Sequence, residues 1–208
     1  MVTGLILFSF GIIFTIRANI GYPPWDVFHV GLAETLGLSL GIVSIIAGIV
    51  ILIIVRLLGE KLGLGTICNI FLIGIFLDII LEVNIIPEMN TVISGIALLI
   101  IGLFAISLGS YFYIKSAFGA GPRDNLMVVL TKKTKIPVGI CRSIIELAVT
   151  IAGWLLGGMV GIGTIIAVIG IGFCIQIVFK IFKFDVTAVQ HENLIETFSA
   201  LIKSIKKN

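Results

Sequence analysis

The chain contains two copies of one segment. When the sequence is shifted by 98 positions without a gap, residues 4–82 align with 102–180, and 25 of the 79 aligned pairs are identical. The identical pairs include residues that control backbone geometry, namely Gly21, Pro24, Gly63, Gly65 and Thr66 with Gly119, Pro122, Gly161, Gly163 and Thr164. Shared glycine, proline and threonine at a constant offset indicate a duplicated unit, which is how many membrane transporters are built.

The amino-acid composition indicates that the chain is surrounded by lipid rather than by water. The sequence is 59% hydrophobic and only 12% charged, and its mean hydropathy is +1.24. Soluble domains carry about 25% charged residues, whereas a membrane helix needs about 20 predominantly apolar residues in a row. Several such runs are present, so the sequence predicts an all-α polytopic membrane protein. It shows no basic aromatic stripe and no nucleotide-binding pattern, so no nucleic-acid partner is expected.

Six segments are predicted to span the membrane. They are residues 2–16, 41–58, 64–82, 91–115, 139–157 and 162–180. The less apolar segments 17–40 and 115–138 each begin with glycine, proline and aspartate and then read as a short polar helix. Proline suits the first turn of a helix, and a carboxylate is favourable near its positive end. We therefore predict one short broken or re-entrant helix in each repeat.

The distribution of positive charge favours six crossings over eight. With six, 13 of the 14 Lys and Arg residues are cytoplasmic and only Arg17 is outside; if both short helices also crossed, five of the 14 would be outside. Cytoplasmic loops of membrane proteins are enriched in Lys and Arg. Three crossings in each repeat place the second repeat upside down relative to the first. The sequence thus predicts two inverted three-helix repeats with both termini in the cytoplasm.

The repeat and the charge pattern together divide the chain into three regions. Residues 1–90 form the first membrane repeat, residues 91–184 the second, and residues 185–208 a cytoplasmic tail. The tail has an apolar stripe at helical spacing, which predicts an amphipathic helix lying on the membrane or on the protein. The first span has about 15 apolar residues, short of the ~20 expected, so we expect further apolar residues upstream of Met1.

One pair of opposite charges belongs to the second repeat alone. Arg142 and Glu146 lie four residues apart, hence on one face of the predicted fifth span. The equivalent positions in the first repeat, Ser44 and Gly48, are uncharged. Ionisable groups inside a membrane usually face a cavity or a partner. The pair therefore either locks two helices together or takes part in a binding site.

The two short helices supply a second candidate set. Asp26 and Asp124 either cap the helix starts or, together with Trp25 and Arg123, line a central cavity that Asn19 could join. The predicted substrate-binding residues are therefore Asn19, Trp25, Asp26, Arg123, Asp124, Arg142 and Glu146.

Thr66 and Thr164 open the predicted third and sixth spans after Gly-x-Gly and suit helix capping. The glycine, proline and threonine residues of the repeated motif are accordingly interpreted as structural. His29 and His191 lack metal-ligand spacing, and the three cysteines lie in apolar runs, so no metal site or cofactor is expected. No catalytic Ser/His/Asp order or zinc-protease motif is present, so the sequence does not predict an enzyme.

Several of these segments resemble a known family. They are Gly21-Tyr-Pro-Pro-Trp-Asp26, Gly63-Leu-Gly-Thr-Ile-Cys-Asn69, Gly119-Ala-Gly-Pro-Arg-Asp124, the Arg142/Glu146 segment and Leu156-Gly-Gly-Met-Val-Gly-Ile-Gly-Thr164. They are similar to the YczE/YyaS/YitT family of bacterial integral membrane proteins, over nearly the whole chain. The resemblance implies a multi-pass protein of the bacterial inner membrane. This family has no settled activity, so it transfers no site residues.

Two functional hypotheses follow from the sequence. The first is a transporter or channel for a small polar or charged solute, with a site at the membrane midplane between the repeats. The second is a membrane scaffold or regulatory subunit whose tail and basic loops bind a cytoplasmic partner. The bilayer is the expected surrounding in both cases, and either is compatible with a homo-oligomer.

Overall fold

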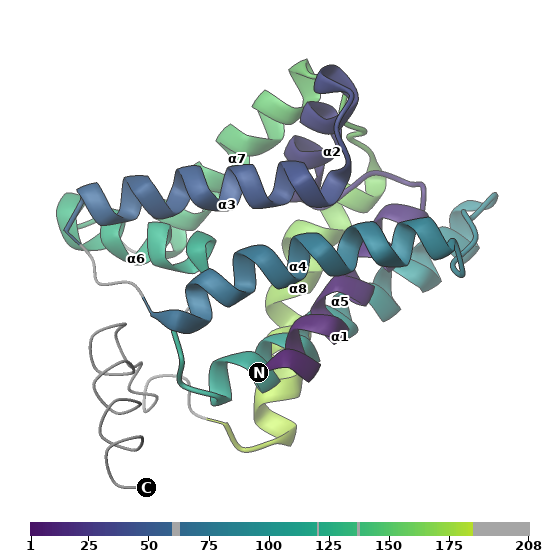
Figure 1. Ribbon diagram of the computed structural model, residues 1–208. Coiled ribbons are helices and arrows are strands. Elements are labelled where there is room, and N and C mark those ends of the chain that lie inside the picture. Colours follow the sequence, from purple (N-terminus) through teal and green to yellow (C-terminus); the bar gives the residue numbers. More distant parts are fainter. Residues whose placement is uncertain (60–62, 120, 137, 185–208) are drawn as a thin grey trace, which may run out of the picture.

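The computed structural model describes residues 1–59, 63–119, 121–136 and 138–184 (Figure 1). This described part is built of α-helices, with no strand in it. The helices are α1 (Val2–Arg17), α2 (Pro24–Leu36), α3 (Leu40–Leu57), α4 (Leu64–Val83), α5 (Val92–Lys115), α6 (Pro122–Thr134), α7 (Val138–Leu155) and α8 (Ile162–Ile181). The predicted amphipathic helix of the tail lies outside the described residues.

Each of the six predicted apolar segments forms one helix, with ends within two residues of those expected. The two short helices also form where the sequence places them. α2 begins at Pro24 and α6 at Pro122, each with proline in the first turn. Both end in a left-handed residue at equivalent positions, Gly37 with φ of 65° and Lys135 with φ of 59°. Local sequence therefore sets the helix boundaries in both halves.

Four of the described helices are long and apolar enough to cross a membrane, namely α3, α4, α5 and α8. α1 is also apolar but has 16 residues, and the described apolar stretch of α7 covers Ser143–Leu155. Many apolar side chains on these helices point outward; Ile93 on α5, for example, is 83% exposed. An outer surface of this kind suits lipid, so the chain is a multi-pass membrane protein.

α1 and α5 pack against each other in opposite directions through glycines. A Cβ atom added to Gly4 would lie 2.8 Å from the backbone oxygen of Gly109, and one added to Gly11 would lie 2.8 Å from that of Gly102. Small residues allow helix backbones to approach this closely in lipid. The buried hydroxyl of Ser9 donates to the carbonyl of Leu5 at 2.9 Å, so it adds no unpaired group to the contact.

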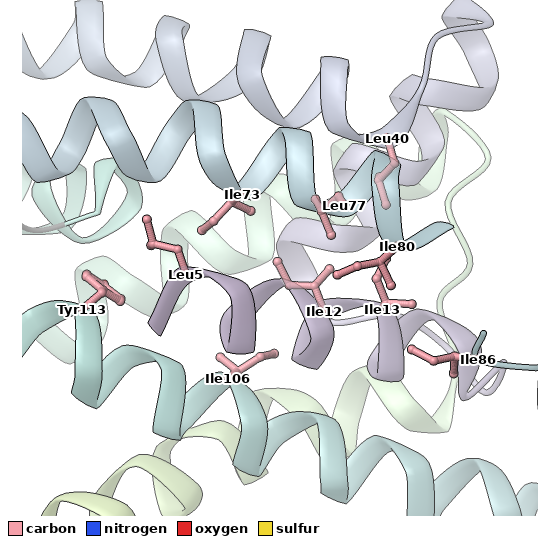
Figure 2. Close-up of a cluster of buried hydrophobic side chains, with 10 residues drawn as sticks. All are labelled: Leu5, Ile12, Ile13, Leu40, Ile73, Leu77, Ile80, Ile86, Ile106 and Tyr113. Atoms are coloured by element: carbon pink, nitrogen blue, oxygen red, sulfur yellow. The ribbon is translucent and has the colours of Figure 1, made fainter. Parts of the chain in front are cut away.

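The largest buried apolar cluster surrounds this helix pair (Figure 2). It contains Leu5, Ile12, Ile13, Leu40, Ile73, Leu77, Ile80, Ile86, Ile106 and Tyr113. The side chains come mainly from α1, α4 and α5, and Leu40 adds the start of α3. α1 and α4 of the first half are thus joined to α5 of the second half by one continuous core.

The two halves also exchange backbone hydrogen bonds. The amide of Gly65, at the start of α4, donates to the carbonyl of Phe118 at 2.7 Å. The amide of Gly163, at the start of α8, donates to the carbonyl of Ile20 at 2.7 Å. Phe118 and Ile20, like Gly163 and Gly65, are 98 positions apart in sequence. Each turn before a short helix is therefore held by the other half of the chain.

Asp78 of α4 caps the start of α3. Its carboxylate accepts hydrogen bonds from the hydroxyl of Ser39 at 2.6 Å and from the amide of Gly41 at 2.7 Å. A carboxylate at a helix N-terminus satisfies a free amide and interacts favourably with the helix dipole. Gln176, at the equivalent position of α8, is exposed. Among the described residues, this cap is therefore found in the first half.

Replacing Asp78 by alanine is expected to destabilise the protein by about 2 kcal/mol, because hydrogen bonds to a charged group contribute about 1.5–3 kcal/mol. The measurement is the thermal unfolding midpoint of the purified protein in detergent. Gln176→Ala is the matched control and should leave the midpoint nearly unchanged, since the side chain is exposed. Equal midpoints for the two variants would show that the Asp78 contacts contribute little.

Candidate functional site

A cavity of about 800 Å³ lies between the two halves of the chain. The starts of α2 and α6 reach it, and residues of α1, α3, α4, α5, α7 and α8 complete its walls. Its polar and charged lining residues are Trp25, Asp26, His29, Ser44, Asn69, Ser110, Tyr113, Arg123, Asn125 and Glu146. The remaining lining is mostly aliphatic, and a cavity with a few polar groups among apolar walls is typical of small-molecule sites.

Equivalent positions of the two repeats meet at this cavity. The lining contains both members of the pairs Pro24 and Pro122, Trp25 and Arg123, His29 and Met127, Gly48 and Glu146, Asn69 and Ala167, Ile70 and Val168, and Ile73 and Ile171. The backbone positions therefore correspond between the halves, whereas the side-chain chemistry differs. The two repeats therefore contribute equivalent backbone positions to the cavity but different charged and hydrogen-bonding side chains.

Asp26 lies in the first turn of α2 and is 4% exposed. Within the described residues its carboxylate accepts no hydrogen bond, and Arg123 is close enough to act on it electrostatically. The sequence left open whether this aspartate caps its helix or lines a cavity. The structure shows it at the cavity, with no side-chain hydrogen bond capping the start of α2. A buried carboxylate without hydrogen bonds is costly unless a cation or proton neutralises it.

Arg123 extends from the start of α6 toward α2. Its Nη2 lies 3.3 Å from Nδ1 of His29, and its guanidinium carbon lies 4.9 Å from the centre of the Trp25 ring. Because the guanidinium can only donate, Nδ1 of a neutral His29 is the acceptor and Nε2 carries the proton. Contact with an aromatic face and a hydrogen bond to His29 together orient the arginine beside the cavity.

His29 is 2% exposed, and its Nε2 atom has no hydrogen-bond partner among the described residues. Buried polar atoms in native proteins are nearly always paired, so an unpaired one calls for an explanation. The sequence showed His29 only as a polar residue of a short helix without metal-ligand spacing. Its role beside Arg123 depends on a contact between residues 94 positions apart, which no local pattern reveals.

Glu146 lines the cavity from α7, and its role in solute binding stays a prediction. The side chains of Asp124 and Arg142 lie outside the part that the structure describes, so the predicted contacts of both stay predictions. Ser44, at the repeat position of Arg142, lines the cavity from α3. Asn69, Ser110, Tyr113 and Asn125 also contribute polar groups, although the sequence did not single them out as site residues.

Asn19 does not line this cavity. It lies in the turn after α1 with a positive φ of 53°, and its amide donates to the carbonyl of Met89 at 3.4 Å. Beside it, Arg17 forms an ion pair with Glu88 at 2.7 Å and a hydrogen bond to Asn84 at 2.7 Å. Asn19 therefore belongs to a polar cluster that ties the end of α1 to the connection between α4 and α5.

The repeated glycine and threonine motifs build the frame of the site. A Cβ atom on Gly21 would lie 2.9 Å from Oγ1 of Thr164, and one on Gly119 would lie 2.9 Å from Oγ1 of Thr66. Thr164 also caps α8 by accepting a hydrogen bond from the amide of Gly161 at 3.2 Å. The close approach requires glycine in both turns, and it places the starts of α2 and α6 at the cavity.

The fold and its cavity define a polytopic helical membrane protein with a buried polar site between two halves. The chain belongs to the family of unknown function DUF6198, which matches residues 1–180. It is 36% identical over 175 residues to the uncharacterized membrane protein YczE of Bacillus subtilis (strain 168), an alignment that covers 83% of this chain and 80% of YczE.

Two further relatives are similar over most of their length. An uncharacterized protein of Haemophilus influenzae (strain ATCC 51907 / DSM 11121 / KW20 / Rd) is 32% identical over 161 residues, which cover 77% of this chain and 73% of that protein. The uncharacterized protein YyaS of Bacillus subtilis (strain 168) is 30% identical over 171 residues, covering 79% and 83%. No solved structure matches this chain. The resemblance to YczE and YyaS is thereby confirmed.

Proposed function

We propose that this protein is a membrane transporter or channel for a small polar or charged solute, which binds in the cavity between the two halves. The observation that carries the proposal is the cavity itself, because the starts of two short helices reach it from equivalent positions in the repeats. Broken helices that line a cavity are the usual way to build a solute site at membrane depth. The apolar outer surface is consistent with a complete crossing of the bilayer.

The proposal includes the inverted arrangement of two three-span repeats in the bacterial inner membrane. Reciprocal contacts support it: the hydrogen bond from Gly65 to Phe118 has its counterpart from Gly163 to Ile20, with equal lengths of 2.7 Å. The opposed glycines of α1 and α5 are likewise exchanged by a shift of 98 positions. Contacts that exchange in this way are expected from two halves related by a two-fold axis. In this arrangement α1 and α7 are the remaining two spans.

The charges in the cavity favour a solute with a cationic end. The Asp26 carboxylate accepts no hydrogen bond within the described residues, whereas the Arg123 guanidinium contacts Trp25 and His29. An ammonium group would satisfy the carboxylate, and the Nε2 proton of His29 suits an acceptor group on the same molecule. A small organic cation or a zwitterion therefore fits the described groups better than a simple anion does.

The test is uptake by the purified protein in liposomes. The panel comprises radiolabelled methylammonium, choline, neutral amino acids, short carboxylates and inorganic phosphate, with protein-free liposomes as the control. We expect saturable uptake of at least one cationic or zwitterionic compound. Saturable uptake of carboxylate or phosphate alone would overturn the charge preference. A lack of saturable uptake across the panel would overturn the transport proposal and favour the scaffold hypothesis.

The proposed topology places Glu88 and Lys133 on opposite sides of the membrane. Each is exposed in the structure, so a cysteine introduced at either position should react with a membrane-impermeant maleimide. In intact cells lacking the native cysteines, we expect labelling of Glu88→Cys from outside and labelling of Lys133→Cys only after lysis. Labelling of both positions in intact cells would rule out this topology.

A further inference from the structure

The two halves differ in how their last two spans pack. α3 lies along α4, whereas in the described residues α7 makes no comparable contact with α8. Figure 1 shows α7 and α8 diverging from the connection between them. The cavity lies in this opening, since Ile145 and Glu146 of α7 line it together with Val168, Ile171 and Ile175 of α8.

Glycines make the contact between α3 and α4 possible. A Cβ atom on Gly74 would lie 2.7 Å from the backbone oxygen of Gly41 and would overlap the side chain of Ile45. Gly172 is the equivalent of Gly74 in α8, yet a Cβ atom there would meet nothing within 4 Å. Glycine inside a helix costs roughly 0.5–1 kcal/mol relative to alanine. The packing of the described residues therefore gives no reason for a glycine at position 172.

We propose that α7 closes onto α8 in a second conformation, in the way that α3 closes onto α4 in the observed one. Gly172 is then the contact point for α7, with Gly139 in the role of Gly41. This inference rests on the proposed function, because alternating access requires the solute cavity to open to one side at a time. If the second half adopts the closed packing while the first half opens, the cavity opens to the other side of the membrane and the binding site between the halves stays the same.

The direction of the switch follows from the proposed topology. Gly41 lies at the start of α3 and Asp78 in the second half of α4, which the topology places toward the outer side of the membrane. The cavity between α7 and α8 reaches Ile175 and Phe179 in the second half of α8, toward the cytoplasmic side. The structure is thus closed outward and open inward. The second conformation is closed inward, and in it the Asp78 cap on α3 is released.

The test is a disulfide between α7 and α8. Glu146 and Val168 are the repeat equivalents of Gly48 and Ile70, and a Cβ atom on Gly48 would lie 3.4 Å from Cβ of Ile70, a separation close to that of a disulfide. The variant carries Glu146→Cys and Val168→Cys in a background where Cys68, Cys141 and Cys174 are alanine, and copper phenanthroline is the oxidant. We expect the disulfide to form in membranes, because the two positions meet when α7 closes.

The matched control pairs Glu146→Cys with Ile169→Cys. Ile169 is one residue further along α8 and 59% exposed, and its equivalent in α4, Phe71, is also exposed. No disulfide is expected there. Equal yields from both pairs would show random collision and overturn the inference. So would a lack of disulfide at position 168 when both cysteines of that variant react with a small maleimide.

A second variant shifts the balance between the two conformations. Adding Asp78→Asn to the Glu146/Val168 cysteine pair weakens the cap that holds the outward side closed, so the disulfide should form about tenfold more readily. An unchanged or lower rate of disulfide formation would contradict the linkage between the two halves.

The cross-linking readouts do not depend on solute uptake. Cross-linking without any saturable uptake would retain the motion and reject transport, whereas uptake without cross-linking would retain transport and reject this motion.

Discussion

Asp26→Asn is expected to abolish solute uptake while leaving the protein folded. Asparagine has nearly the same shape as aspartate, but it removes the negative charge that the cavity offers. Removing one partner of a buried charge pair typically costs about 2–5 kcal/mol, so we expect binding of the cationic or zwitterionic solute to weaken by about 100-fold. The measurements are uptake into liposomes and equilibrium binding in detergent, using the compound that the wild type transports.

Stability separates this role from a structural one. The Asp26 carboxylate is 4% exposed and accepts no hydrogen bond within the described residues. Replacing a costly buried charge by a neutral amide should leave the thermal unfolding midpoint unchanged or raise it. Glu34→Gln, an exposed site on the same helix, is the control and should keep both uptake and stability. If Asp26→Asn lowers the midpoint and keeps full uptake, the carboxylate is structural.

Gly11→Ala is expected to lower the stability of the protein substantially. The new Cβ would lie 2.6 Å from Cγ1 of Ile106, 2.7 Å from its amide nitrogen and 2.8 Å from the Gly102 oxygen. Two of these atoms belong to the backbone of α5 and cannot rotate away, so the helices must separate. Overpacking of this kind costs about 1–3 kcal/mol, and a backbone contact belongs at the upper end.

Gly172→Ala is the matched control for this substitution. It also adds one methyl group to a glycine in an apolar helix, but the added atom would meet nothing within 4 Å. The higher helix propensity of alanine should then stabilise the protein slightly. The thermal unfolding midpoints in detergent compare the two variants. Equal effects would contradict the close packing of α1 on α5.

The structure brings together site residues that the sequence could only place on separate segments. The sequence indicated Trp25, Asp26 and Arg123 because each lies beside a proline at the start of a short polar helix. That signal is local, and the structure places all three at the cavity. His29 and Asn69 had no comparable signal. Their contribution depends on packing between distant helices, and in a chain so rich in isoleucine and leucine the apolar residues do not specify partners.

Asp78 and Asn19 illustrate the same limit. A single aspartate near the end of an apolar span is compatible with exposure to water, and its role in capping α3 emerges only when α4 lies beside that helix. Asn19 is close enough in sequence to join the site, but a left-handed turn directs it to Met89 instead. In both cases the local backbone conformation or a neighbouring helix decides what the side chain contacts.

The sequence by itself determined the duplication, the helix boundaries and the membrane class of this protein, because these depend on local composition, on proline and glycine, and on residues repeated at a fixed offset. Only the tertiary structure decided that α1 packs on α5, that α3 packs on α4 while the described residues of α7 make no comparable contact with α8, and that Arg123 reaches His29. The physical reason is that these contacts join residues far apart in the sequence, so they depend on how the helices pack and not on any local pattern.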